Sequence, residues 1–382
     1  MHTLFAFDSF KGVFTSEEAA SIASKAFKEQ LNTSTETLAI ADGGEGTLDT
    51  LVNNRRGRTI EVETSDPLGR KIKARYGIID DYTAVIEMAE AAGMMRLKHD
   101  EANPLKASTH GVGTLIVDAL ERGIRSFIVG IGGSATNDMG MGLLSALGYR
   151  FYDARGTLLS ASGEAMEKVS EIDGTTRHEA LEKTHFVIAC DVKNPLFGEN
   201  GAAYVFAPQK GADMHITKTL DQGLRHFSAV SAKHAGAAEN LPRDGAAGGI
   251  GAGMRMFLGA ELRNGFDVIS EICGMDEIIG KADLVVTGEG KIDRQTLSGK
   301  APYELAIKAR AMGKPVVAIA GIVDVPFKLR GAFPFDAMLG TMKCHDPDDG
   351  AGTDENFEDN LRGVSLEAAR LIRCGMDFNT IP

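Results

Sequence analysis

The stretch SFIVGIGGSATND, residues 126–138, indicates the fold class of this chain. It begins with a short apolar run at residues 126–131 and continues into a loop of glycine, serine and acidic or amide residues. A helical pattern follows at residues 142–147. An apolar strand, then a glycine-rich loop, then a helix is typical of a parallel β-sheet that is covered by helices on both faces.

The same order of elements recurs along the chain, which predicts an α/β protein with parallel sheets. Further apolar runs that lead into acid-bearing loops lie at residues 4–7, 38–41, 186–190 and 284–287. Two more predicted strands lie at residues 316–320 and 337–339, and predicted helices lie at residues 111–121, 216–234 and 301–312. Thr15 and Glu18 have the spacing of a capping box, which predicts a helix that begins there.

The length of the chain predicts about two domains. It has 382 residues, and a domain takes roughly 150. The turn sequence DPLG at residues 66–69 and the stretch before Asp283 are the probable boundaries. We therefore expect a discontinuous first domain of residues 1–65 and 285–382, with residues 66–284 inserted as a second α/β domain.

Composition excludes several classes of function. The net charge is −12, whereas a general nucleic-acid binder needs a basic face. Aromatic residues are only 6% and Trp is absent, so RNA recognition by stacking is not expected. No apolar run approaches the ~18 residues of a membrane span, and the N-terminus has no signal-peptide pattern. Four widely spaced cysteines favour reduced thiols in a cytoplasmic protein over disulfides or a zinc site.

Charged residues gather where the predicted strands end. Ligands of open α/β sheets bind beyond the carboxyl ends of the strands. Any one acid there could be an ordinary turn residue, but acids interleaved with lysines suit Mg²⁺ and a polyphosphate. The acids are Asp8, Asp42, Glu45, Asp138, Asp191, Glu289 and Asp293, and the lysines are Lys11, Lys193, Lys210 and Lys291.

Residues 130–135, GIGGSA, fit a dinucleotide fingerprint, and Asp153 follows at the expected spacing of about 20 residues. Against this reading, the loop continues through residues 136–138 before a helix can begin. A glycine-rich loop that cradles an anion with its backbone N–H groups is the favoured interpretation. The chain has no Walker A sequence, no protein-kinase signature and no complete GxSxG elbow.

Two segments allow several readings. The glycine run at residues 245–253 fits a flexible hinge, a close-packed helix start or a ligand loop. Residues 346–359 carry seven acids and no base, and they are expected to form a solvated surface loop.

Seven motifs, in order from residue 8 to about 300, together resemble the bacterial class of glycerate kinases that forms 2-phosphoglycerate. They are DSFKG (8–12), ADGGEGT (41–47), HGVG (110–113), GGSATND (132–138), QKGA (209–212), GAAGG (245–249) and TGEGKID (287–293). The resemblance implies a flavodoxin-like domain built from both chain ends, an inserted domain of different topology, and the use of ATP, Mg²⁺ and D-glycerate. Met139 stands where the family usually has glycine, and residues 346–359 look like an insertion.

The predicted function is the ATP-dependent phosphorylation of D-glycerate to 2-phospho-D-glycerate by a cytoplasmic enzyme. The alternatives are an NAD(P)-dependent dehydrogenase of a hydroxy acid and a non-catalytic anion-binding protein. The expected partner is the small molecule glycerate, with no nucleic acid and no membrane, and the sequence gives no oligomeric state.

The expected site residues fall into three groups. The catalytic candidates are Asp42, Asp191, Asp293 and Lys11, of which Asp191 and Asp293 are the metal candidates. No histidine has a catalytic spacing, so a carboxylate is expected to be the base, and Asp42 and Asp191 both stay candidates. The substrate- and nucleotide-binding candidates are Asp8, Ser9, Gly43, Gly44, Glu45, Gly132, Gly133, Ser134, Asn137, Asp138, Lys210, Glu289 and Lys291.

Overall fold

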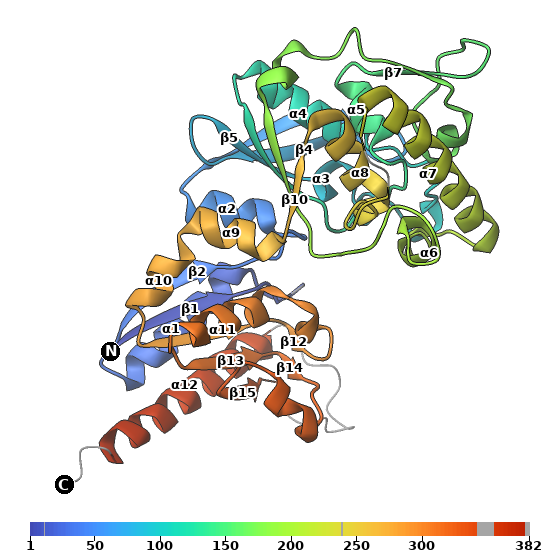
Figure 1. The fold of residues 1–382 in the computed structure, drawn as a ribbon. Coiled ribbons are helices and arrows are strands. Elements are labelled where there is room, and N and C mark those ends of the chain that lie inside the picture. The colour runs from blue at the N-terminus through green and yellow to red at the C-terminus, as the bar shows by residue number, and fades with distance from the viewer. Residues whose placement is uncertain (11, 238–239, 342–354, 379–382) are drawn as a thin grey trace. The chain divides into compact units, whose positions relative to one another are not determined.

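A computed structural model describes residues 1–10, 12–237, 240–341 and 355–378 of the chain (Figure 1). The chain divides into two compact units. Unit 1 comprises Met1–Asp42 and Ile269–Pro382, and unit 2 comprises Gly43–Val268. Both units are α/β structures with parallel strands, as the sequence predicts.

Unit 1 is built on a five-stranded parallel sheet in the order β15-β13-β11-β1-β2. Numbered within the unit, this order is 2-1-3-4-5, the order found in flavodoxin. A two-stranded parallel ladder of β12 and β14 lies beside it. The strands are β1 His2–Phe7, β2 Ser34–Ala39, β11 Leu284–Gly288, β12 Lys291–Ile292, β13 Val316–Ala320, β14 Ile322–Val323 and β15 Ala337–Gly340.

Helices cover this sheet on both faces. Crossovers between parallel strands are right-handed, so connections that run toward opposite edges of the sheet place their helices on opposite faces. On one face α1 packs against α12, and Phe27 of α1 meets Phe5 of β1 edge-to-face at 5.0 Å. On the other face α10 contacts α11. The helices are α1 Ser16–Gln30, α10 Met275–Lys281, α11 Ala301–Ala311 and α12 Glu355–Phe378, with 3₁₀ turns at Thr296–Ser298 and Phe327–Ala332.

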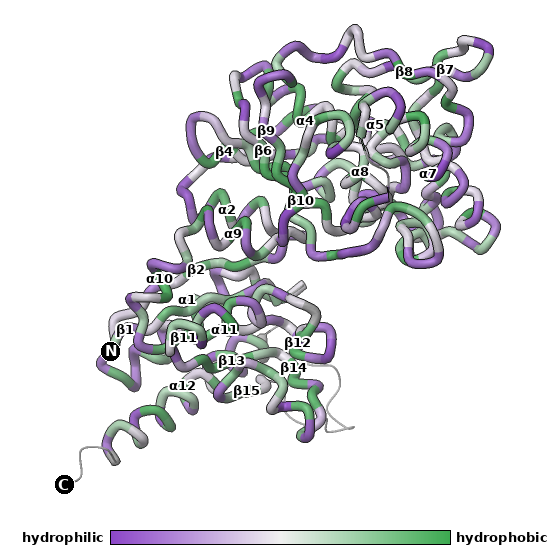
Figure 2. Tube along the Cα trace, viewed as in Figure 1, coloured by the Kyte–Doolittle hydropathy of each residue, from purple (hydrophilic) through white to green (hydrophobic). Residues whose placement is uncertain are grey.

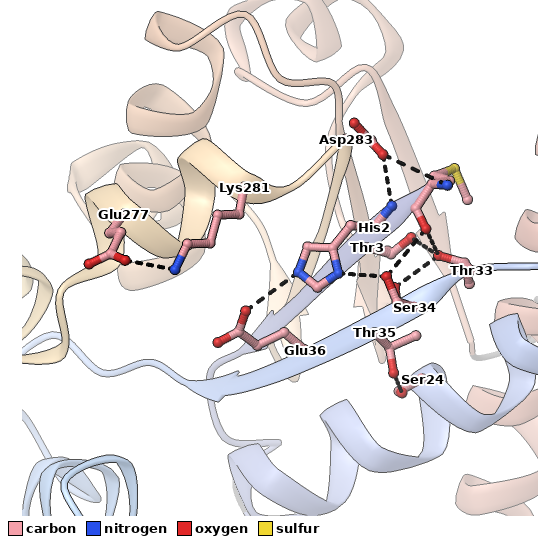
Figure 3. A network of polar contacts seen from close by, with 11 residues as sticks. His2, Thr3, Ser24, Thr33, Ser34, Thr35, Glu36, Glu277, Lys281 and Asp283 are labelled. Atoms are coloured by element: carbon pink, nitrogen blue, oxygen red, sulfur yellow. Dashed lines mark hydrogen bonds and ion pairs between the residues drawn. The ribbon is translucent and has the colours of Figure 1, made fainter.

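The two chain segments of unit 1 are joined by polar contacts at the amino ends of their strands (Figure 3). The N–H of His2, at the start of β1, donates to Asp283 Oδ2 at 2.8 Å, just before β11. The ring of His2 reaches Ser34 Oγ at 2.9 Å and Glu36 at 3.4 Å, both on β2. The opposite edge of this sheet, at the carboxyl ends of the strands, carries the predicted site residues of unit 1.

Unit 2 contains a six-stranded mixed sheet in the order β10-β9-β6-β5-β4-β3. The strands β5, β6, β9 and β10 are parallel, whereas β3 and β4 form an antiparallel hairpin that the apolar-run pattern did not predict. Figure 2 shows hydrophobic residues along β6 and β9, the central strands. The strands are β3 Arg58–Ser65, β4 Lys71–Ile78, β5 Thr83–Glu87, β6 Ser126–Gly130, β9 His185–Ala189 and β10 Glu261–Arg263, with a separate antiparallel pair, β7 Arg150–Tyr152 and β8 Glu171–Asp173.

The helices of unit 2 pack on its sheet or on one another, most of them around one large hydrophobic core. They are α2 Thr47–Asn54, α3 Ala89–Ala92, α4 His110–Glu121, α5 Met141–Ala146, α6 Ala202–Phe206, α7 Met214–Ala235 and α8 Ala246–Leu258. Helix α9, Gly265–Cys273, crosses from unit 2 into unit 1. The 3₁₀ turns are η1 Met94–Arg96, η2 His99–Glu101, η3 Gly163–Lys168, η4 Glu179–Lys183 and η5 Pro208–Lys210.

The predicted domain boundaries differ from the limits of these two units. Strand β3, residues 58–65, was assigned to the first predicted domain, yet it pairs with β4 in the sheet of unit 2. The hydrogen bonds of the β3–β4 ladder hold residues on both sides of the DPLG turn in one sheet. The two-domain division at residues 65/66 and 284/285 stays a prediction.

Two other expectations concern single segments. Residues 355–359, the end of the predicted acidic loop, are the first turn of α12, and residues 346–354 lie outside the described residues. Among the residues that the structure describes, no helix has the length and apolar character needed to cross a membrane.

Candidate active site

Two glycine-rich segments of unit 2 pack directly on each other at the carboxyl ends of β6 and β9. Gly43 has φ 93°, and a Cβ there would lie 2.9 Å from the Cβ of Ala189 at the end of β9. A Cβ on Gly132 would lie 2.6 Å from the Cα of Gly44. Only glycine allows these approaches, because any side chain would meet the facing backbone or methyl group. The structure therefore brings the predicted residues Gly43, Gly44 and Gly132 together, and the predicted Glu45 lies exposed in the same loop.

Glu87, which the sequence analysis did not single out, anchors this loop. It ends β5 and is 5% exposed. Its carboxylate accepts hydrogen bonds from the N–H of Gly46 at 3.1 and 3.2 Å and from that of Leu48 at 3.1 Å, at the start of α2. Burial raises the pKa of Glu87 to about 7, and the two N–H donors offset only part of that rise. The sequence feature that could have identified Glu87 is its position as the one acid at the end of the apolar run TAVIE, residues 83–87.

The loop at residues 130–138 is fixed at its end by Asp138. Asp138 Oδ2 accepts from both the N–H and the hydroxyl of Thr109, at 2.8 and 2.9 Å, and from the N–H of Gly142 at 3.1 Å. Asp138 Oδ1 accepts from the N–H of Gly140 at 3.1 Å. Burial raises the pKa of Asp138, whereas these four donors favour the charged form. Asp138 thus ties the loop to the first turns of α4 and α5.

Lys210 supports the same loop from inside the protein. Its ammonium donates to Ser134 Oγ and to the carbonyl oxygen of Thr136, both at 2.7 Å. The residue is 1% exposed, and burial lowers the pKa of its amine from 10.5 to about 7. The structure therefore brings the predicted residues Lys210 and Ser134 into contact, and in this state the ammonium faces the loop and not solvent.

The centre of the loop contains buried polar groups that no described residue satisfies. The side-chain N and O of Asn137 and the hydroxyl of Thr136 are buried, and among the described residues they have no hydrogen-bond partner. Buried polar side chains without partners are rare in folded proteins, and an unseen water, ion or ligand is a common reason. Gly133, with φ 71°, gives the loop a turn next to these groups. The donor set fits an oxygen-rich anion.

The glycine run 245–253 forms a close-packed helix start, one of its three possible roles. Helix α8 contains left-handed residues at Ala247, Gly248 and Gly249. A Cβ on Gly248 would lie 2.2 Å from the carbonyl oxygen of Thr136, so this helix packs on the back of the 130–138 loop. Met139, the residue that follows this loop, has φ 50°, a conformation that favours glycine, and it is the position where the family usually has glycine.

Asp191 lies just beyond β9 and is partly buried. Its Oδ1 accepts a hydrogen bond from the N–H of Gly265, the first residue of α9, at 2.9 Å. One carboxylate oxygen is thus held by the helix start, which fixes the orientation of the group.

The predicted residues of unit 1 gather at the carboxyl ends of neighbouring strands. Asp8 follows β1 and donates its N–H to the carbonyl oxygen of Gly288 at the end of β11, at 2.9 Å. Ser9 comes next and donates its N–H to Asp8 Oδ1 at 2.7 Å. Asp42 comes shortly after the end of β2. The predicted Lys11 lies outside the described residues.

The loop after β11 is held by ion pairs. Glu289 accepts from Lys300 Nζ at 2.6 Å and from the hydroxyl of Thr296 at 2.7 Å, while burial raises its pKa. Lys291 pairs with Asp324 at 2.8 Å and lies 3.7 Å from Asp293. Lys300 was not among the predicted site residues. The one sequence feature that could have pointed to Lys300 was the pair Gly299-Lys300, but the residues around it do not form a Walker A motif.

Among the described residues, no three acidic, histidine or cysteine side chains are grouped closely enough to hold a metal ion by themselves. Mg²⁺ that serves nucleotide chemistry usually takes one or two carboxylates, with phosphate oxygens and water as its other ligands. The carboxylates of Asp191 and of Asp293 are each oxygen donors of that kind. The residues present fit a metal that arrives with the nucleotide.

The dinucleotide reading of residues 130–135 is not supported by the structure. Helix α5 begins only at Met141, whereas the fingerprint requires the helix to start inside the glycine motif. Asp153, the acid at the spacing that the fingerprint expects, accepts from the N–H groups of Arg155 and Thr157 in a tight turn.

These features define an α/β protein whose glycine-rich loops and acids lie at the carboxyl ends of its strands, an arrangement suited to phosphate chemistry. The sequence matches the glycerate kinase family over residues 3–373, and the chain belongs to that family. It is therefore an enzyme of a phosphotransferase family that uses ATP as co-substrate.

Three relatives illustrate the match. The chain is 39% identical to "Glycerate 2-kinase" of Escherichia coli over 98% of this chain and 99% of that protein. It is 41% identical to "Glycerate kinase" of Bacillus subtilis, covering 85% of this chain and 86% of that one. The crystal structure of a putative glycerate kinase 2 from Salmonella typhimurium superposes with a TM-score of 0.88 at 36% identity, covering 99% of both chains.

Proposed function

We propose that the protein transfers the γ-phosphoryl group of ATP to the 2-hydroxyl of D-glycerate and forms 2-phospho-D-glycerate. The observation that carries this proposal is the loop at residues 130–138. Its turn is held by Asp138 and Lys210, and the Asn137 amide inside it has no hydrogen-bond partner in the part of the chain that the structure describes. Family membership supplies the substrate class, and the Escherichia coli relative supplies the position of the phosphorylated hydroxyl.

The glycine-rich segments serve as the phosphate cradle in this proposal. Backbone N–H groups in tight turns present partial positive charge to an anion, and the absence of side chains at Gly132 and Gly133 leaves the backbone accessible. Because the loop is anchored from behind by Lys210, its donors are held in place before the nucleotide arrives, which lowers the cost of ordering them.

Asp191 and Asp293 would hold Mg²⁺ on the ATP phosphates. The metal, when bound, offsets the charge that builds up on the phosphoryl oxygens during transfer. Lys11 and Lys291 would contribute point charges to the phosphate or to the glycerate carboxylate. Asp8, Ser9 and Glu289 would orient these groups from the ends of β1 and β11.

Asp42 or Asp191 would accept the proton of the 2-hydroxyl. An alcohol has a pKa far above neutrality, so a base must take its proton as the new P–O bond forms and the bond to ADP breaks. The hydroxyl oxygen bonds to phosphorus, ADP leaves with the electron pair, and the proton goes to the carboxylate.

The test is ADP release with a panel of hydroxy acids, with and without Mg²⁺, followed by ³¹P NMR of the product against 2- and 3-phosphoglycerate. We expect turnover with D-glycerate only in the presence of Mg²⁺, and the signal of the 2-phosphate. Formation of 3-phosphoglycerate would contradict the regiochemistry alone. Failure to turn over D-glycerate, with NAD(P)H-dependent activity or simple anion binding in its place, would contradict the proposed activity.

A further inference from the structure

A polar cavity lies within unit 2, and none of the predicted site residues lines it. Its volume is about 740 Å³. The walls come from the turn at residues 65–69 between β3 and β4, from the approach to α4 at residues 106–110, and from residues 159–168 with η3. A cavity of this size holds a molecule well beyond a single water or simple ion.

The cavity lies on the side of the sheet where parallel α/β proteins bind ligands. The β3–β4 ladder continues from the pair Arg58–Ile78 as far as Ser65–Lys71, whereas β4 pairs with β5 only at Gly77 and Ile78. Since β3 runs parallel to β5, the far end of the hairpin extends past the carboxyl end of β5. Its turn contacts the approach to α4, where the N–H of Ser108 donates to the carbonyl oxygen of Pro67 at 2.9 Å, and both segments line the cavity.

The charges around this cavity favour an anion. Lys106 and Lys168 line it and are exposed, and the ammonium group of neither has an ion-pair or hydrogen-bond partner in the described part of the chain. Asp66 is already neutralised by Arg70, and it also accepts from the N–H of Leu68 at 2.9 Å. Glu164 is the one remaining acid in the lining. Two lysines and two acids therefore line the cavity, and because Asp66 is paired with Arg70 outside the lining, the two lysine ammonium groups face one other carboxylate, that of Glu164.

The cavity also offers hydroxyl groups. Five serines line it, namely Ser65, Ser108, Ser145, Ser160 and Ser162. The Ser108 oxygen accepts from the N–H of His110 at 3.3 Å, which leaves its own O–H free to donate. Lysine ammonium groups suit a carboxylate or phosphate, and serine hydroxyls both donate to and accept from alcohol groups. This combination matches a small anion that also carries hydroxyl groups.

The floor of the cavity is in direct contact with the glycine-rich loop. Thr109, between the lining residues Ser108 and His110, donates two hydrogen bonds to Asp138. A Cβ on Gly142 would lie 2.2 Å from Ser108 Oγ, so α5 packs closely on the same floor. A ligand that contacts Ser108 or His110 would thus lie next to Thr109, which holds Asp138 at the end of the 130–138 loop.

We propose that this cavity is a second ligand site, which binds a small hydroxylated anion, a carboxylate or a phosphate monoester, through Lys106, Lys168 and the serine hydroxyls. The site is separate from the residues assigned to phosphoryl transfer, and it does not depend on the activity proposed above.

The His110 ring supplies a local readout. Burial lowers the pKa of His110, and an anion bound beside it raises that pKa. The full-length protein is titrated by NMR with inorganic phosphate, with D-glycerate and with racemic glycerol 3-phosphate, and His110→Gln assigns the ring signal. We expect a saturable shift of the His110 signal and a higher His110 pKa with at least one probe. The order of affinities separates a carboxylate ligand from a phosphate ligand.

Variants test whether the lysines hold the anion. We expect the double variant, Lys106→Met with Lys168→Met, to lower the affinity for the probe that shifts the His110 signal. The loss should be about tenfold or more, because two charge-assisted contacts are removed. Lys168→Met alone removes one of the two contacts, so it should lower the affinity for the probe by less. Lys233→Met, an exposed lysine of α7 outside the cavity, should leave binding unchanged. The proposal is overturned if no probe moves His110, or if the double variant, with unchanged melting temperature, binds as the parent does.

Discussion

The Lys210 ammonium donates a hydrogen bond of 2.7 Å to the hydroxyl of Ser134 in a part of unit 2 that water does not reach. A second bond of equal length goes to the carbonyl oxygen of Thr136. A buried lysine that bonds to two atoms of one loop restricts the conformations of that loop. Residues far apart in the chain thereby give the 130–138 loop a fixed shape.

We expect Lys210→Met to destabilise the protein and to impair turnover. The substitution keeps the length of the side chain but leaves the Thr136 carbonyl and the Ser134 hydroxyl without their buried donor, which costs about 1–3 kcal/mol. Thermal unfolding and the kcat of ADP release measure the two effects. Lys218→Met, at an exposed lysine of α7, is the control and should change neither.

Lys210→Met should also change how the free energy of unfolding depends on pH. The pKa of Lys210 is about 7 in the folded protein and 10.5 for an ordinary lysine, so the unfolded chain binds more protons between those values. Stability should therefore rise with pH from about 7 to 10 in the parent relative to Lys210→Met. A difference in unfolding free energy that stays flat over this range would show that the buried amine keeps an ordinary pKa.

Asp191→Asn and Asp293→Asn should each lower turnover by orders of magnitude while leaving the melting temperature nearly unchanged. Asparagine keeps an oxygen that can accept from Gly265 N–H at the first position and from Gln295 N–H at the second. The charge that would attract Mg²⁺ is removed, so the Mg²⁺ concentration for half-maximal rate should increase.

Asp276→Asn is the matched control for these two variants, because Asp276 is an exposed acid that pairs with Lys308. It should keep the parent's rate and Mg²⁺ dependence. Full activity in both Asp191→Asn and Asp293→Asn would remove these residues from the metal site.

Glu87 makes stability depend on pH in the opposite direction to Lys210. Its pKa is about 7 in the folded protein and 4.5 for an ordinary glutamate, so between these values the folded state binds more protons than the unfolded state. The parent should therefore lose stability relative to Glu87→Gln as pH rises from about 5 to 7, and the difference should level off above 7. Denaturant unfolding of both proteins across this range measures it. A constant difference would show that the carboxyl group titrates normally.

Several strands of unit 1 were predictable from sequence because they are continuous apolar runs, whereas β2, STETLA, is mostly polar and the predicted run at residues 38–41 overlaps only its last two residues. The predicted runs at residues 4–7 and 316–320 lie within or match β1 and β13. The capping box of Thr15 and Glu18 is also confirmed, with both of its hydrogen bonds present. The β3–β4 hairpin was missed because its residues alternate in polarity and include many charges, which is the pattern of a half-exposed antiparallel strand.

The site was predictable in its loops but not in its supports. Each glycine motif, with its acids at the end of a strand, is a short continuous stretch of sequence, so it could be recognised without the structure. Glu87 and the burial of Lys210 depend on residues that approach only in the folded chain. The pairing of Lys210 with Ser134 joins positions 76 residues apart. No local pattern reports such a contact.

The close approach of Gly132 to Gly44 provides a test of the loop packing. Gly132→Ala should destabilise unit 2 by about 1–3 kcal/mol and reduce turnover, because the new methyl group would lie 2.6 Å from the Gly44 Cα and would push the two loops apart. Gly280→Ala, in helix α10, is the control. There a Cβ meets nothing within 4 Å, and alanine is the better helix former, so a gain of up to about 1 kcal/mol is expected. Chemical denaturation and ADP release are measured on both variants. If Gly132→Ala matches the parent in stability and rate, the two loops do not pack as described and the cradle is not formed by their contact.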